Sequence, residues 1–218
     1  NEKAGQFPDT KWKINNLGRG WVLGETLITG IGQGYTQTTP IQLCLMTAQI
    51  ANGGYKIQPK ILTDDNELTS KQVKKAMQDS KINNSYEPLY DDQKNIRIVQ
   101  EAMFSSTNEI MGTSYKSRID DPKYQFAGKT GTAQVKRISK RERELDLETF
   151  QIPYEERDHA LYVAYGPYSN PRYAVSIIVE HGGSGSSAAA PMATKLFKLI
   201  VDRHQYRKKL SDYKEFSI

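Results

Sequence analysis

The segment FAGKTGTAQV, residues 126–135, decides how the rest of the chain is arranged, and Lys129-Thr130-Gly131-Thr132 lies at its centre. Side chains alternate along a strand, so Thr130 and Thr132 point to one side. Gly131 lets another backbone come close, and Lys129 adds a positive charge. The four residues predict a strand edge that binds a carboxylate and can pair with an extended peptide.

The same segment also allows a second chemical role and a purely structural one. The backbone N–H of Thr132 is available to stabilise a developing oxyanion. The structural alternative is an edge strand rich in glycine and threonine that carries one surface lysine, because Lys-Thr-Gly alone is too short to exclude it. No nucleophile stands beside the four residues, so the surrounding sequence has to decide between these interpretations.

The sequence that follows predicts a β-hairpin beside this strand. HALYVAYG (159–166) and RYAVSIIVE (172–180) are apolar runs, and the short turn PYSNP lies between them. Both runs are apolar on both faces, which indicates a sheet that is covered on both sides. We therefore expect an α/β (α+β) fold in which an antiparallel sheet of three contiguous strands is flanked by helices.

Two helices are predicted before the strand. Thr39-Pro40-Ile41-Gln42 fits a capping box with proline at the first helical position, and Asn52-Gly53-Gly54 ends that helix. The segment DQKNIRIVQEAMF (92–104) has the apolar spacing of a second amphipathic helix. The residues predicted on its inner face are Ile96, Val99, Ala102 and Met103.

A third helix is predicted near the C-terminus, and the other segments are expected to lie at the periphery. The segment 182–204 reads as a Gly/Ser loop that leads into a helix whose inner stripe is Met192, Leu196, Leu199 and Ile200. Four peripheral segments are expected: 1–38 without helical periodicity, a polar segment 63–92, a charged excursion 136–157, and a charged, fraying tail 205–218. No linker divides the chain, so residues 1–218 are predicted to belong to one domain.

Composition narrows the class of function. The 218 residues have a formal net charge of +5, but their basic residues are interleaved with acids, which favours an ordinary basic surface. Aromatic and basic residues do not cluster as in proteins that bind single-stranded nucleic acid. Cys44 is the only cysteine, and the three histidines share no ligand spacing. We therefore expect no intrachain disulfide, no metal and no other cofactor.

The sequence carries no sign of its cellular location. No apolar run approaches the ~18 residues of a membrane span, and no signal peptide opens the chain. The first residues, NEKAGQFPDT, read like the middle of a loop. We therefore expect the chain to be part of something longer.

Several longer segments carry a resemblance to a known family. They are AGQFPDTKWK, GETLITGIGQGYTQTTPIQL, NGGYKIQPKIL, FAGKTGTAQV, IPYEERDHALYVAYGPYSNP and GSSAAAP. Together they resemble the C-terminal part of the transpeptidase domain of the serine penicillin-recognising enzymes, in which Lys-Thr-Gly is the third signature motif. Within that family the chain is most similar to the penicillin-binding protein 2 group, the class B enzymes of cell elongation. The RDHALYVAYGPY block favours this group over its division-specific relatives.

The resemblance implies a role for each matching residue. Lys129 would position the substrate and tune the proton relay, while Thr130 and Thr132 would hold the carboxylate of a stem peptide or of a β-lactam. The N–H of Thr132 would form half of the oxyanion hole, and Gly131 would let the acyl-D-Ala-D-Ala strand dock. The charged excursion before His159 would overhang the cleft.

The chain departs from the family pattern because its nucleophile is missing. The family places a Ser-x-x-Lys motif and a Ser-x-Asn/Asp motif upstream of Lys-Thr-Gly, and neither is found upstream here. Ser106-Thr107-Asn108 fits the second pattern but stands too close to the strand, and 211–214 (SDYK) fits the first but follows the strand. We therefore expect an incomplete transpeptidase fold without its serine and base lysine. Its exposed sheet edge would favour self-association.

The function implied is that of a peptidoglycan D,D-transpeptidase, with this chain as an inactive part of it. The parent protein would be anchored in the bacterial inner membrane and face the periplasm. Its partners would be D-Ala-D-Ala stem peptides, β-lactams and a glycosyltransferase of the elongation machinery. The alternatives are a non-catalytic penicillin-binding or sensor module, a β-lactamase relative, and an unrelated basic binding domain.

Overall fold

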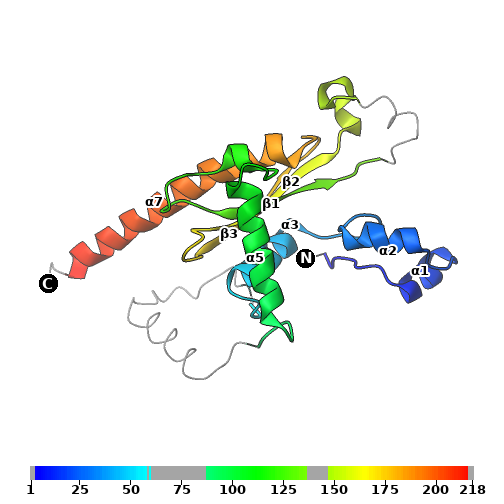
Figure 1. Ribbon diagram of the computed structural model, residues 1–218, viewed down its shortest axis with the longest axis horizontal. Helices are drawn as coiled ribbons and strands as arrows, with labels where there is room; N and C mark the ends of the chain where they lie inside the picture. Colours follow the sequence, from blue (N-terminus) through cyan, green and yellow to red (C-terminus); the bar gives the residue numbers. More distant parts are fainter. Residues whose placement is uncertain (1–2, 58, 60–86, 137–146, 216–218) are drawn as a thin grey trace.

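The structure, a computed structural model, describes residues 3–57, 59, 87–136 and 147–215, with side chains as far as Arg203 (Figure 1). The α-helices are α1 (Thr10–Leu17), α2 (Leu23–Gly30), α3 (Pro40–Ala51), α5 (Gln93–Asn108) and α7 (Ala190–Glu215). The strands are β1 (Ala127–Ala133), β2 (His159–Gly166) and β3 (Tyr173–Val179), and the short helical turns are η1 (Tyr115–Ser117), η2 (Thr149–Gln151), η3 (Tyr154–Glu156) and η4 (Gly185–Ala189).

The three strands form one antiparallel sheet in the order β1-β2-β3. Thr130 lies opposite Tyr162 across β1 and β2, and Gly166 lies opposite Tyr173 across the hairpin. The hairpin turn closes where Arg172 donates its backbone N–H to the carbonyl oxygen of Gly166 at 3.1 Å. The predicted strand and hairpin are therefore confirmed.

Helices cover both faces of this sheet, as predicted. On one face η4 and α7 pack over fully buried Phe126, Tyr162 and Phe197, and the rings of Phe126 and Phe197 stack with centroids 4.9 Å apart. On the other face α3 and α5 pack around buried Met103 and Tyr165. The strand that holds Lys129-Thr130-Gly131-Thr132 is thus supported from both sides.

The start and end predicted for α3 are confirmed. Thr39 accepts the backbone N–H of Gln42 on its hydroxyl at 3.3 Å, and Gln42 accepts the backbone N–H of Thr39 at 2.9 Å. The helix ends at Ala51, after which Gly53 and Gly54 have φ of 94° and 90°. Glycine tolerates these left-handed values without the strain that a Cβ would bring.

The helix predicted at 92–104 is also present, but two of the residues predicted on its inner face are exposed. α5 is buried through Ile96, Met103 and Thr107, while Val99 is 39% exposed and Ala102 is exposed. The buried threonine shows that the inner face is partly polar, which a search for apolar spacing does not find. This polar side chain contacts β1, as described below.

Half of the inner stripe predicted for the C-terminal helix was wrong: Leu196 packs against the core and Ile200 is half-buried, but the other two residues are exposed. Met192 and Leu199 are 49% and 69% exposed, and the face of α7 that packs on the sheet consists of Ala190, Ala193, Phe197 and Val201. The small alanine side chains let this face lie close to the sheet, and Phe197 fills the space beside them. The tail expected to fray from residue 205 continues as part of α7 to Glu215.

Two helices, α1 and α2, lie within residues 1–38, where no helical periodicity was found in the sequence. α1 is capped by Asp9, which accepts the N–H of Trp12, and ends at Gly18 with φ of 63°. Lys13 is 6% exposed and forms an ion pair with Glu25 of α2. Figure 1 shows both helices projecting away from the sheet, on the opposite side of the molecule from the C-terminal end of α7.

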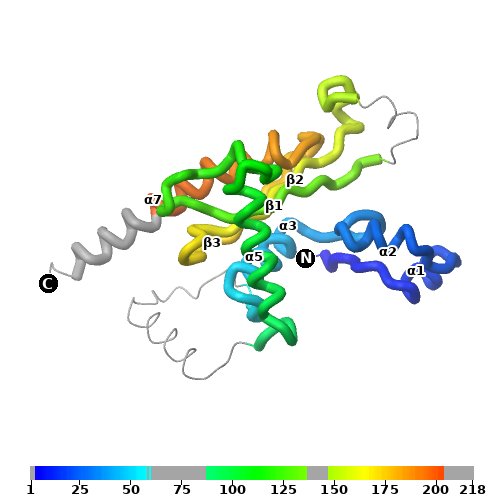
Figure 2. The backbone as a smooth tube through the Cα atoms, in the orientation of Figure 1, coloured from blue at the N-terminus to red at the C-terminus, as the bar shows by residue number. Residues whose placement is uncertain are grey.

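The peripheral segments agree only in part with the sequence. Figure 2 shows η2 and η3 beyond the end of the sheet at which β1 ends and β2 begins. Residues 63–86 and 137–146 lie outside the described residues. None of the described helices is long and apolar enough to cross a membrane.

Candidate functional site

The edge of β1 that faces away from β2 is unpaired from Thr130 to Thr132 in the described part of the chain. The hydroxyl of Thr107, near the end of α5, accepts the backbone N–H of Gly128 at 3.0 Å and lies 3.4 Å from its carbonyl oxygen. These backbone groups therefore point away from β2. Their direction repeats with period two along an antiparallel strand, so the backbone groups of Thr130 and Thr132 point the same way. No strand in the described part of the chain pairs with this edge.

The four residues of the predicted site meet at this edge. Lys129 and Thr132 are exposed, and Thr130 and Gly131 are half-buried. Lys129 Nζ donates to the carbonyl oxygen of Thr130 at 2.8 Å and to the Thr130 hydroxyl at 3.4 Å. The edge thus presents an ammonium, two hydroxyls and backbone groups that no strand of the described chain pairs with, which suits a carboxylate at the end of an extended chain.

The turn η4 closes one face of the sheet behind this edge. A Cβ on Gly185 would lie 2.4 Å from the carbonyl oxygen of Leu161 and 2.8 Å from that of Gly131, so the backbone at Gly185 rests directly on two strands. Gly131 itself has more room, with a Cβ 3.4 Å from that of Leu161. Gly185 therefore makes the close contact of η4 with the sheet possible, and the approach of a ligand strand at Gly131 stays a prediction.

A buried polar cluster holds α5 and the segment after it against β1. The hydroxyl of Tyr162 lies 2.9 Å from that of Thr107 and 3.1 Å from that of Ser114, and all three residues are buried. Ser114 also donates to the carbonyl oxygen of Ser106 at 3.0 Å. Burial raises the pKa of Tyr162, against a smaller lowering by its two hydroxyl partners. The phenol therefore stays neutral and serves as a fixed hydrogen-bond group.

A second, exposed set of hydroxyls reaches the site itself. Thr113 Oγ1 lies 3.2 Å from Thr130 Oγ1 and 3.2 Å from Ser106 Oγ. Sequence reasoning did not find Ser106 or Thr113 as site residues. The hydroxyls at 105–107 and 113–114 were the available signal, but only the fold brings Thr113 beside Thr130.

Neither of the two segments that resemble family motifs supplies a nucleophile at this edge, although the Ser106 hydroxyl reaches it through Thr113. The side-chain amide of Asn108 donates to the carbonyl oxygens of Phe104 and Phe126, both at 3.0 Å, and Thr107 is buried. Ser106-Thr107-Asn108 therefore ties α5 to the start of β1. Residues 211–214 fall in the last turns of α7, beyond the described side chains.

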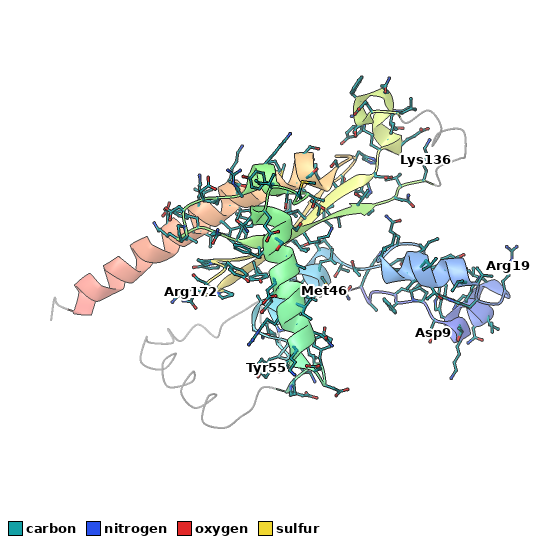
Figure 3. All side chains as sticks on the ribbon, in the orientation of Figure 1. Asp9, Arg19, Met46, Tyr55, Lys136 and Arg172 are labelled. Carbon is teal, nitrogen blue, oxygen red and sulfur yellow. The ribbon has the colours of Figure 1, made fainter. Side chains whose placement is uncertain are left out.

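An open groove lies elsewhere, between α3 and α5. Its lining includes Met46, Ile50, Tyr90, Ile96 and Val99. Figure 3 shows Met46 beside α5. None of the residues from 129 to 132 lines this groove, so it is separate from the edge of β1.

Comparison with known proteins finds a family that covers nearly the whole chain. Residues 1–198 match the family described as "Penicillin binding protein transpeptidase domain". The chain is 34% identical over 208 residues to the peptidoglycan D,D-transpeptidase MrdA of Haemophilus influenzae, a match that covers 93% of this chain and 30% of the relative. It is 36% identical over 190 residues to the MrdA of Acinetobacter baumannii, with 86% and 26% covered.

Solved structures show the same likeness. The PBP2 of Helicobacter pylori, solved in a complex with MreC, superposes with a TM-score of 0.72 at 29% identity and covers 93% of this chain and 32% of that one. The PBP2 of Pseudomonas aeruginosa, in complex with WCK 5153, gives a TM-score of 0.63 at 33% identity, with 90% and 38% covered. The chain spans about 30% of the length of the curated relative from H. influenzae.

Proposed function

This chain belongs to the penicillin-binding protein transpeptidase family, and we propose that it is the C-terminal part of the transpeptidase domain of a PBP2-type peptidoglycan D,D-transpeptidase. The observation that carries this proposal is the open edge of β1, with Lys129, Thr130 and Thr132 along it. The similarity to relatives that bear this name supports it over a β-lactamase or an unrelated basic domain.

In this proposal the edge of β1 binds the end of a stem peptide. The terminal carboxylate lies against the hydroxyls of Thr130 and Thr132, within the positive field of Lys129. The peptide backbone pairs with the outward N–H and C=O groups of β1, which aligns the scissile carbonyl with the strand. The N–H of Thr132 then donates to the oxyanion that forms when a serine attacks that carbonyl and D-alanine is displaced.

The attacking serine and its base lysine come from outside this chain in our proposal. Acyl transfer needs a nucleophile, a base and oxyanion donors within hydrogen-bond distance of one another. The chain has the binding wall and one oxyanion donor, but no Ser-x-x-Lys motif upstream of Lys129. We therefore expect the 218-residue chain alone to be catalytically inert.

Labelling with a fluorescent penicillin tests this proposal. A full-length protein that contains this chain should give a covalently labelled band on a denaturing gel, and the 218-residue chain should give none. Prior treatment with unlabelled penicillin should abolish the band. A labelled band from the isolated chain would contradict the missing nucleophile. Reversible binding without a covalent band from the full-length protein would favour the sensor module.

The proposal extends to location and partners. We place the full-length protein in the bacterial inner membrane with this portion in the periplasm, working with a glycosyltransferase of the elongation machinery. Fractionation of cells tests the location, since recovery of the full-length protein from the soluble cytoplasmic fraction would contradict it. Affinity purification from solubilised membranes tests the partner, which should be recovered with the protein.

The isolated chain is expected to self-associate. Exposed strand edges invite pairing with another chain, and the edge of β1 at Thr130 and Thr132 has no partner strand in the described part of the chain. Leu23, Leu27 and Ile31 around α2 are also 67–77% exposed. Sedimentation velocity should therefore show oligomers, and ANS fluorescence should rise on binding. A sharp monomer that binds no ANS would contradict this expectation.

A further inference from the structure

We propose that Thr113 is a positioning residue for the ligand carboxylate, because it orients the hydroxyl of Thr130. This inference rests on the function proposed above. Thr113 lies between α5 and η1, and its hydroxyl is 3.2 Å from the Thr130 hydroxyl on one side and 3.2 Å from the Ser106 hydroxyl on the other. The three hydroxyls form a short chain that ends at the edge of β1.

The direction of these hydrogen bonds follows from counting protons. A threonine hydroxyl has one proton to donate and can accept on its oxygen. If Thr130 donates its only proton to a carboxylate, its oxygen acts as the acceptor in every other hydrogen bond that it makes. Lys129 Nζ is 3.4 Å from that oxygen and closer, at 2.8 Å, to the Thr130 carbonyl oxygen. Thr113 is therefore the better placed donor.

In this arrangement Ser106 donates to Thr113, Thr113 donates to Thr130, and Thr130 donates to the ligand. In the opposite direction, Thr130 would donate its only proton to Thr113. No hydroxyl donor would then remain for the carboxylate at Thr130. Each donor in such a chain polarises the next one and strengthens it. Thr113 acts through Thr130 and does not itself touch the ligand.

The backbone around Thr113 is fixed well enough to play this role. The next residue, Ser114, is 1% exposed, and its N–H and its hydroxyl both donate to the Ser106 carbonyl oxygen at 3.0 Å. The preceding residue, Gly112, packs so closely that a Cβ would lie 2.3 Å from the same oxygen. Thr113 is thus held between two residues that are tied to the end of α5.

The test uses a full-length protein that contains this chain and two probes, a penicillin and the same penicillin with its carboxylate methylated. The measured quantity is the second-order rate constant of acylation for each probe. Losing one net hydrogen bond lowers such a constant about 3- to 10-fold. For Thr113→Val we expect that loss with the free acid and an unchanged rate with the methyl ester. Thr113→Ser restores the hydroxyl and should restore the rate.

Two controls separate this role from a structural one. Ser105→Ala removes a neighbouring hydroxyl that bonds Glu109 at 2.9 Å instead, and it should leave both rates unchanged. Circular dichroism melts check that the variants fold alike. An equal loss with both probes, or no loss with the free acid, would overturn the role of Thr113. If the wild type reacts with neither probe, the proposed function itself fails.

Discussion

Replacing Lys129 by alanine in a full-length protein that contains this chain will lower the rate of acylation by a penicillin about 100-fold, as expected for the loss of a charged donor at a catalytic centre. Lys129 is exposed, and its contacts are with the neighbouring Thr130. Its removal therefore takes charge from the open edge without disturbing the core. The measurement is the second-order rate constant of labelling with a fluorescent penicillin.

A matched control separates this local effect from a change in overall charge. Lys116→Ala removes the same charge from another exposed lysine, located in η1, and should leave the labelling rate within about 2-fold, since exposed charges are screened by salt. Thermal melts of both variants should match the wild type. If the two substitutions lower the rate equally, Lys129 has no special position in the site and the proposed function loses its main support.

The strands and the helix ends were predictable because short local patterns specify them. The alternation and length of 159–166 and 172–180, with a turn between them, correspond to β2 and β3 to within one residue. The capping box at Thr39 formed as its sequence indicates, because its hydrogen bonds join residues three apart. Such features depend on near neighbours in the chain and hardly on the rest of the fold.

The helices α1 and α2 near the N-terminus were missed because neither of them buries an apolar side chain. The only buried residue of α1 is Lys13, and α2 buries none. A charged residue that pairs with Glu25 gives no hydrophobic period, so the pattern of apolar residues contained no signal. The cap at Asp9 and the glycine at 18 were the local marks of α1.

The residues of the candidate site could be predicted from the sequence, but the contacts that hold them in place could not. The residues Lys129 to Thr132 stand together in the sequence, and alternation alone places Thr130 beside Thr132 on one side of the strand. Thr113 reaches Thr130 because α5 packs on β1 and turns back at Gly112, which no local pattern reports. The buried cluster of Tyr162, Thr107 and Ser114 likewise joins three segments through tertiary contacts.

The face of α7 gives the second large effect. Phe197→Ala should lower the free energy of unfolding by about 3–5 kcal/mol, as for other large-to-small changes in a core. The ring of Phe197 is fully buried and stacks on the ring of Phe126. It also lies against the backbone of Gly166, where an added Cβ would be only 3.1 Å from the ring. Truncation therefore removes these contacts and leaves a cavity between α7 and the sheet. Urea denaturation followed by circular dichroism measures the change.

Leu199→Ala is the matched control, because it truncates a large apolar residue two positions along the same helix. Leu199 is 69% exposed, so its loss should change the free energy of unfolding by no more than about 0.5 kcal/mol. The apolar pattern of the sequence assigns Leu199 to the inner stripe and predicts a large cost there. A cost at Leu199 equal to that at Phe197 would therefore show that α7 packs on the sheet through the stripe of large residues, and the alanine-lined face would have to be abandoned.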